Sequence, residues 1–264
     1  MEERNIEAIN KTLMNYQKKW FFKTCQPWIK TKPKDNEMKK YMKGEPYSYS
    51  QPFCTGLCKN VKSPLIMFVG QETNGWGKIE DFAAYKDCKM PKDTFESSQQ
   101  DTIRFTFENF YNDNDKNHST FWAFINDIKN RCEFSFDICW NNLDKIHYSS
   151  KGEACITLYS EDEDYLNGKT NNSPSLLKLE IETIKPEAII FLTGPSYQTS
   201  MAGALRPIQL NKPTLSAPVS EFEYNGRPCA WTYHPTYLRT KAKQHIRTDV
   251  PDELVNFLNK YCKK

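Results

Sequence analysis

Four short apolar runs, each ending at polar residues or at a glycine, constrain the fold of this chain more than any other sequence feature. The runs are PLIMFVG at 64–70, FSFDICWNN at 134–142, AIIFLTG at 188–194 and PCAWTYHP at 228–235. Runs of this kind are typical of strands buried on both faces of a parallel sheet. Helical patterns alternate with them along the chain. The sequence therefore predicts an α/β fold, a three-layer α/β/α domain with a central, mainly parallel four-stranded sheet.

The helices between the runs are predicted from apolar residues at helical spacing. Ser119 stands where it can cap one of them, and Pro186 follows another as a stop. The expected inward faces are Ile6, Ile9, Leu13 and Trp20; Phe121, Phe124, Ile125 and Ile128; Leu176, Leu179 and Ile184; and Leu254, Phe257, Leu258 and Tyr261 in a closing helix at 251–261.

Length and charge set the broad class. A chain of 264 residues fits one large domain better than two small ones. We expect a single domain over 1–264, with a helical and loop extension at 1–62 and an insertion at 78–117. The net charge is +3, from 36 basic and 33 acidic residues, so a nucleic-acid surface must come from local arrangement.

Cysteine usage and the chain start indicate the compartment. Nine cysteines without regular spacing do not resemble the disulfide framework of a small secreted domain. Cys54 and Cys58 lack a second pair or a nearby histidine, so no metal site is expected. The N-terminus resembles neither a signal peptide nor a membrane span. We expect a cytoplasmic, bacterial, monomeric protein without membrane contact, metal or organic cofactor.

The ends of the predicted strands carry the candidate functional residues. Ligands of parallel α/β sheets bind beyond the carboxyl ends of the strands. A phosphate-binding loop after Gly70 is excluded, because Trp76 stands where that motif requires lysine. The residues expected to converge on one cleft are Gln71 and Glu72, Asn141 and Asn142, Gly194 to Ser196, and His234.

These strand ends, in this order, resemble the motifs of the uracil-DNA glycosylase superfamily. FVGQET is similar to the family's first motif, with Glu72 at the acid position and Thr73 replacing a proline. DICWNNLDK resembles the strand that ends in a base-reading asparagine, which falls on Asn142. TYHPTYLR resembles the last motif, His-Pro-Ser followed by a loop with an apolar residue. The resemblance spans about 64–240.

The resemblance implies a monofunctional glycosylase that flips uracil or a related modified pyrimidine out of DNA and hydrolyses its N-glycosidic bond. Glu72 would orient or deprotonate water, and His234 would donate a hydrogen bond to the departing base. Gly70, Gln71 and Asn142 would bind the base, with Trp76 or Trp140 stacked on it. The expected DNA contacts are Ser196, Thr236, Arg239 and, as a wedge, Leu238.

Each candidate also has an ordinary structural interpretation. Glu72 fits a solvent-facing loop, His234 a structural histidine and Asn142 a strand-end amide. Trp76 and Trp140 fit the core, and Leu238 fits a packed loop. Two other functions therefore stay open: a catalytically inactive DNA- or nucleotide-binding module of the same fold, and a hydrolase of free nucleosides or nucleotides.

Overall fold

The computed structural model describes residues 4–31, 48–49, 53, 55–57, 61, 64–71, 119–146, 148–150, 153–156, 160–170 and 172–263. Its centre is a sheet of five strands in the order β3-β2-β6-β8-β7. The strands are β2 (Leu65–Gly70), β3 (Asp137–Asn142), β6 (Ala188–Phe191), β7 (Val219–Tyr224) and β8 (Arg227–Thr232). A second, small antiparallel sheet has the order β1-β4-β5: β1 (Ser48–Tyr49), β4 (Tyr148–Ser150) and β5 (Glu153–Ile156).

The four expected strands are the parallel part of the central sheet. β2 pairs in parallel with β3 and β6, and β6 pairs in parallel with β8. The count of four is corrected by β7, which pairs antiparallel with β8 through the turn at Asn225 and Gly226. Both turn residues have positive φ, 50° and 73°, as a tight two-residue hairpin requires.

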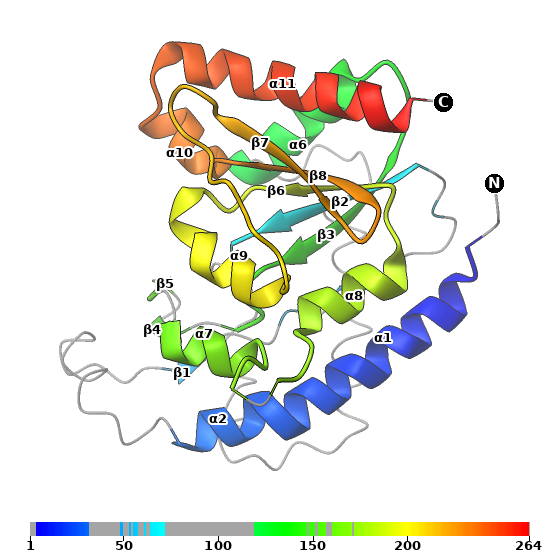
Figure 1. The fold of residues 1–264 in the computed structure, drawn as a ribbon, viewed down its shortest axis with the longest axis vertical. Helices are drawn as coiled ribbons and strands as arrows, with labels where there is room; N and C mark the ends of the chain where they lie inside the picture. The colour runs from blue at the N-terminus through cyan, green and yellow to red at the C-terminus, as the bar shows by residue number, and fades with distance from the viewer. Residues whose placement is uncertain are drawn as a thin grey trace.

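Helices cover both faces of the sheet, so the domain has the expected three layers (Figure 1). One face packs α6 (Thr120–Arg131), α10 (Pro235–Thr240) and α11 (Gln244–Cys262). The other packs α8 (Leu176–Ile184) and α9 (Gln198–Ala204), with α1 (Ile6–Trp20) lying along α8. The remaining helical segments are a π-helical turn (Phe21–Cys25), α2 (Gln26–Thr31), α7 (Ser160–Leu166) and a 3-10 turn (Pro195–Tyr197).

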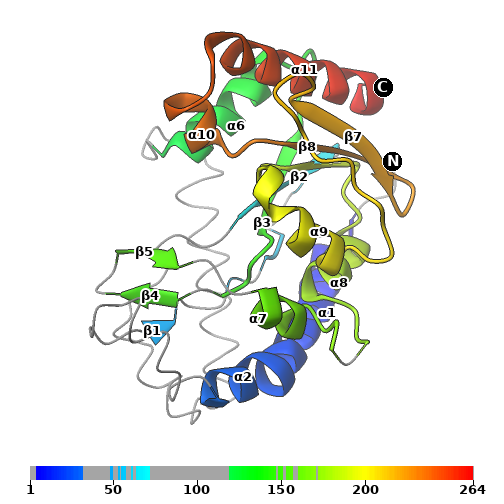
Figure 2. The same cartoon turned by 60° about the vertical axis from the view of Figure 1, so that its left-hand side comes forward.

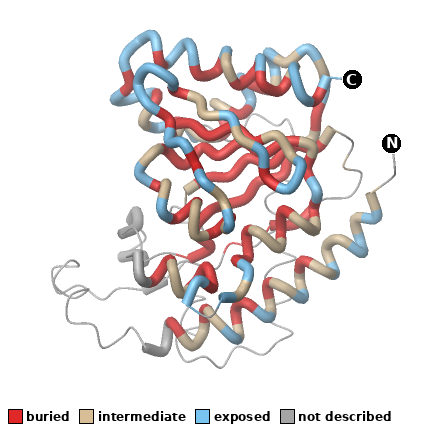
Figure 3. Tube along the Cα trace, in the orientation of Figure 1, coloured by how far each residue is buried: buried red, intermediate tan, exposed pale blue. Residues whose placement is uncertain are grey.

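Successive side chains of each strand point to opposite faces of the sheet, so the core has two parts. Ile66 and Phe68 of β2 face α6 and α11, whereas Leu65, Met67 and Val69 face α8 and α9. All six residues of β2 are buried, which is why its sequence is continuously apolar (Figure 3). The central strands are therefore rigid supports for whatever their carboxyl ends carry.

Two helices differ from the sequence prediction. α11 begins at Gln244 rather than at Pro251, and Tyr261 is 44% exposed instead of inward. Ile246 and Val250 are buried one turn apart ahead of the proline, and burying them offsets a helix-interior proline cost of about 3 kcal/mol. In α8 the inward face includes Glu180, whereas Leu179 is only half-buried.

Candidate active site at the strand ends

The carboxyl ends of β2, β6 and β8 meet at one edge of the sheet, the edge turned forward in Figure 2. The Gln71 side chain crosses from β2 to β6, where its Nε2 donates to the Thr193 carbonyl oxygen at 2.6 Å. Gly194 has a φ of 80°. A Cβ added to it would lie 3.7 Å from His234 N and 3.9 Å from Gln71 Nε2. The structure thus brings Gln71, Gly194 and His234 together, as expected.

Because Gly70 has no side chain, Asn142 at the end of β3 can lie close to the end of β2. A Cβ on Gly70 would lie 2.6 Å from Asn142 Oδ1 and 3.4 Å from the ring of Phe121. The first of these distances is shorter than any non-bonded contact that a Cβ makes. Glycine is therefore required here for close approach of its neighbours rather than for backbone freedom.

Asn142 is held in one amide orientation. Its side chain is buried, and Trp140 Nε1 donates to its Oδ1 at 3.1 Å. An indole N–H is only a donor, so the atom facing it must be the amide oxygen. Within the part of the chain that the structure describes, Asn142 Nδ2 is buried without a hydrogen-bond partner. Among the described residues, two N–H donors and one oxygen lone pair of Asn142 are therefore without a partner.

His234 is held as a neutral ring. It is the N-cap of α10, and its Nδ1 accepts from the backbone N–H of Thr236 at 3.2 Å. Burial lowers the pKa of His234 from 6.5 to about 4, because desolvation disfavours the imidazolium. With Nδ1 accepting, the proton of the neutral ring sits on Nε2. The residue is thus a hydrogen-bond donor at neutral pH that carries no charge.

Phe121, which its sequence pattern places only on the apolar face of a helix, also lies at the candidate site. Its half-buried ring stacks on His234, with 6.0 Å between ring centroids and 25° between planes. It also lies 6.1 Å from the Trp140 ring and beside Gly70. Its place in the sequence STFWAF gives no signal that separates it from ordinary core aromatics.

Trp140 was a candidate to stack on a bound base, and its position excludes that role. The ring is only 8% exposed and packs against Phe53 and Trp122, at 4.6 Å and 5.4 Å between centroids. Its contribution to the site is the hydrogen bond to Asn142. The side chain belongs to the core and acts as a support.

Leu238 was expected to enter the DNA duplex, and the structure does not present it for that role. The side chain lies in α10, is 4% exposed and belongs to the core cluster under α11. Thr236, Arg239 and Ser196, the other expected DNA contacts, are all exposed.

Two further predicted residues, Glu72 and Trp76, lie outside the described residues, so their predicted roles stay predictions. Among the described residues, no group of three or more His, Cys, Asp or Glu side chains is arranged to hold a metal ion. No helix in that part of the chain is both long and apolar enough to cross a membrane.

The chain around the site has an unusual distribution of charge. It has no Asp or Glu between Glu187 and Glu221, nor between Glu223 and Asp249, although 33 of its 264 residues are acidic. These two segments contain β6, α9, β8 and α10 and hence half of the site edge. The cations within them are Arg206, Lys212, Arg227, Arg239, Lys241, Lys243 and Arg247. These two segments thus carry a surplus of positive charge despite the small net charge of the chain.

Comparison of the sequence with models of known families and with curated proteins finds no match.

Proposed function

We propose that this protein is a DNA glycosylase of the uracil-DNA glycosylase type, which hydrolyses the N-glycosidic bond of uracil or a related modified pyrimidine in DNA. The observation that carries the proposal is that two groups lie at the same sheet edge: a neutral, oriented His234, and an Asn142 amide whose N–H donors have no partner among the described residues. The central α/β sheet with helices on both faces is compatible with that type of enzyme.

The chemistry requires stabilisation of a departing pyrimidine anion. When the bond between C1′ and nitrogen breaks, negative charge develops on the base oxygens. A neutral His234 with its proton on Nε2 donates a hydrogen bond to such an oxygen and carries no charge of its own. The stack with Phe121 keeps the ring plane fixed. Glu72, which follows Gln71 in the chain, would orient the attacking water.

Recognition of the base would use Asn142 and Phe121. One N–H of Asn142 Nδ2 suits the O4 acceptor of uracil, and the remaining lone pair of Oδ1 suits its N3–H. Phe121, which is half-buried beside Gly70, offers a ring on which a flipped base can stack. Cytosine has a donor at the position of O4, so the Asn142 orientation disfavours it.

Leu215, in place of Leu238, would be the apolar residue that enters the DNA duplex. Leu215 is 51% exposed, in a turn closed by the Thr214 N–H donating to the Ala217 carbonyl at 2.9 Å. The following strand begins at Val219 opposite Thr232, so the turn lies at the edge that carries His234. An apolar side chain there can fill the space that a flipped nucleotide leaves.

Base release from labelled oligonucleotides tests the proposal. The substrates contain uracil, hypoxanthine, xanthine, hydroxymethylated pyrimidines or other modified pyrimidines, and the proteins are wild type, Glu72→Gln and His234→Ala. We expect release of one pyrimidine, reduced on the order of 10²- to 10³-fold by His234→Ala. His245→Ala, which removes an exposed histidine of α11, is the matched control and should leave release unchanged.

Two outcomes would contradict the glycosylase. No release from any substrate, with tight binding to abasic DNA that neither change affects, would identify an inactive binding module. Release from free nucleosides at least as fast as from DNA, with little dependence on salt, would identify a nucleoside hydrolase.

A further inference from the structure

A buried polar cluster lies directly behind the candidate site, on the opposite face of β3. It consists of Gln17 from α1, Asn141 from β3, Lys145 from the loop after β3 and Glu180 from α8, none more than 6% exposed. Lys145 Nζ lies 2.5 Å from Glu180 Oε2 and also donates to Asn141 Oδ1. Gln17 Nε2 donates to Glu180 Oε1 at 3.1 Å.

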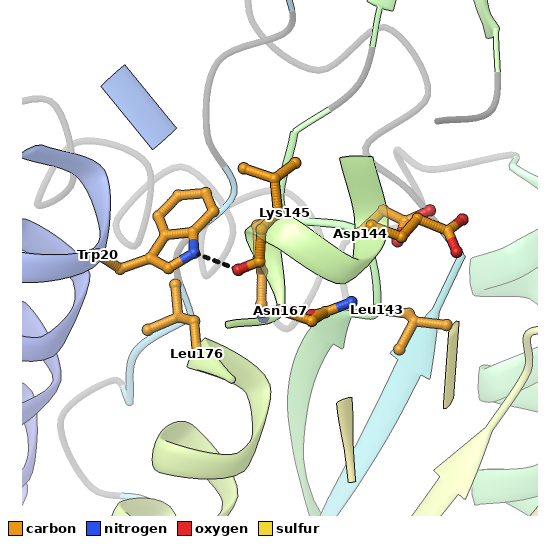
Figure 4. A pocket seen from close by; sticks show the side chains of 8 residues that line it. Trp20, Leu143, Asp144, Lys145, Asn167 and Leu176 are labelled. Carbon is orange, nitrogen blue, oxygen red and sulfur yellow. Dashed lines mark hydrogen bonds between the residues drawn. The ribbon is translucent and has the colours of Figure 1, made fainter. Parts of the chain in front are cut away.

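Stability alone does not account for this ion pair. Removing a lysine and a glutamate from water costs several kcal/mol per ion, and apolar residues of the same volume often stabilise a fold equally well or better. The neighbouring pocket, lined by Trp20, Lys145 and Asn167, has a volume of about 10 Å³, room for at most one water molecule (Figure 4). The pair is therefore not hydrated by bulk water and has a defined geometry.

The geometry fixes the amide of Asn141. Its Oδ1 accepts from Lys145 Nζ and from the backbone N–H of Asn142, the latter at 2.8 Å. Its Nδ2 donates to Glu180 Oε2 at 3.0 Å and faces the thioether of Met67 at 3.8 Å. A flipped amide would set its N–H donors against the ammonium and the Asn142 N–H. The ion pair therefore permits only the orientation that holds Asn142.

We propose that Lys145 and Glu180 are positioning residues for the candidate site. They lock the amide of Asn141 so that it holds the backbone of Asn142 and sets where the Asn142 side chain leaves the strand. The role in base release rests on the proposed function, whereas the lock on Asn142 does not. Gln17 gives α1, from the N-terminal extension, a part in the same cluster, because it donates to Glu180 and to the Thr55 carbonyl at 2.8 Å.

The test uses Lys145→Met/Glu180→Gln, which removes both charges without leaving one unpaired. The first readout is the NMR signal of the Asn142 backbone and side-chain amides, which we expect to shift relative to wild type. The second is single-turnover base release, which we expect to fall roughly tenfold to a hundredfold. In an Asn142→Ala background the same double change should alter release by less than about twofold, because the cluster acts through Asn142.

The control is Arg4→Met, which removes the ion pair between Arg4 and Glu187 at the opposite end of the sheet. It should lower stability without shifting the Asn142 amides. If the double variant does not fold, Lys145→Gln/Glu180→Gln, a second change that removes both charges, is measured in the same two ways.

Unshifted Asn142 amides in a folded variant would overturn the positioning role. So would an equal loss of release in the wild-type and Asn142→Ala backgrounds, which indicates a general structural effect. Shifted amides in a protein that releases no base from any substrate would support the lock and overturn only the proposed function.

Discussion

At the scale of single residues, the site depends on groups that are fixed before any ligand binds. The His234 ring is oriented by one backbone N–H and one aromatic ring, and the Asn142 amide by one indole. Each orientation is set by a group that can only donate a hydrogen bond, a backbone N–H for His234 and an indole N–H for Asn142. Preorganised donors of this kind stabilise developing charge without reorganisation during the reaction.

The pKa of His234 makes stability depend on pH in a defined window. In the folded protein this pKa is about 4, below its ordinary value of 6.5, so the unfolded chain binds the proton more readily. The stability is therefore fully present above pH 6.5 and is lost as pH falls toward 4. We expect the free energy of unfolding to fall in this window by on the order of 3 kcal/mol more than in His234→Gln.

Two measurements check this pH dependence. An NMR titration should place the imidazole pKa near 4, and urea unfolding at several pH values should give the difference between the two proteins. A wild-type imidazole that titrates between 6 and 7 would contradict both the burial argument and the neutral donor.

Gly70→Ala tests the close approach at the end of β2. The added methyl would meet Asn142 Oδ1 at 2.6 Å, so Asn142 must move away from its position. We expect base release to fall at least about tenfold. Gly203→Ala is the control, since its Cβ lies 3.9 Å from the nearest atom, and in helix α9 it should stabilise by about 0.5–1 kcal/mol without affecting release.

At the scale of elements, sequence patterns found the buried strands and missed features set by tertiary contacts. β2, β3, β6 and β8 were predictable because burial on both faces leaves an apolar run. β7 was missed because an edge strand can be polar, as VSEFEY is, although the following Asn225-Gly226 is a strong hairpin signal.

The candidate site was predictable to a similar degree. The convergence of Gln71, Gly194 and His234 followed from the parallel sheet, whereas the burial of Leu238 depended on how α10 packs under α11. Glu180 carried an unused signal, because it stands on the apolar stripe of α8, four residues after Leu176 and four before Ile184. A charge in such a place predicts a buried partner.

The Leu215 turn gives a prediction about an element. Leu215→Ala should weaken binding and base release on duplex DNA about tenfold and leave single-stranded substrate nearly unchanged, because only a duplex has a stack to fill. Tyr261→Ala is the control, since it removes the other large exposed apolar side chain among the described residues, near the far end of α11. Equal effects of Leu215→Ala on both substrates would contradict a wedge.

At the scale of the whole molecule, the net charge is small, but acidic residues are distributed unevenly along the sequence. The segments around β6, α9, β8 and α10 lack acidic residues, and the acids that balance the net charge lie elsewhere. Figure 1 places α10 and α1 on opposite sides of the sheet, so the lysines of α1 lie on the face away from α10. We therefore expect the cations of α10 and of the turn after it to make the contacts with DNA phosphates.

The salt dependence of the proposed DNA binding tests this expectation. Neutralising Arg239, Lys241 and Lys243 as glutamines removes three cations from the site edge. Each phosphate that the protein no longer neutralises should lower the slope of log K against log salt by about 0.9. We expect the slope to become shallower by about 2–3 and the affinity to fall for all sequences alike.

The matched control neutralises Lys11, Lys19 and Lys23, three exposed lysines on α1 and the turn after it, also as glutamines. Both triple variants have the same net charge, since +3 minus 3 is 0. Binding that depended on total charge would weaken equally in the two, whereas binding at the site edge weakens only in the first. Equal slopes, measured by fluorescence anisotropy from low to moderate salt, would place the DNA elsewhere on the protein and contradict a site at the strand ends.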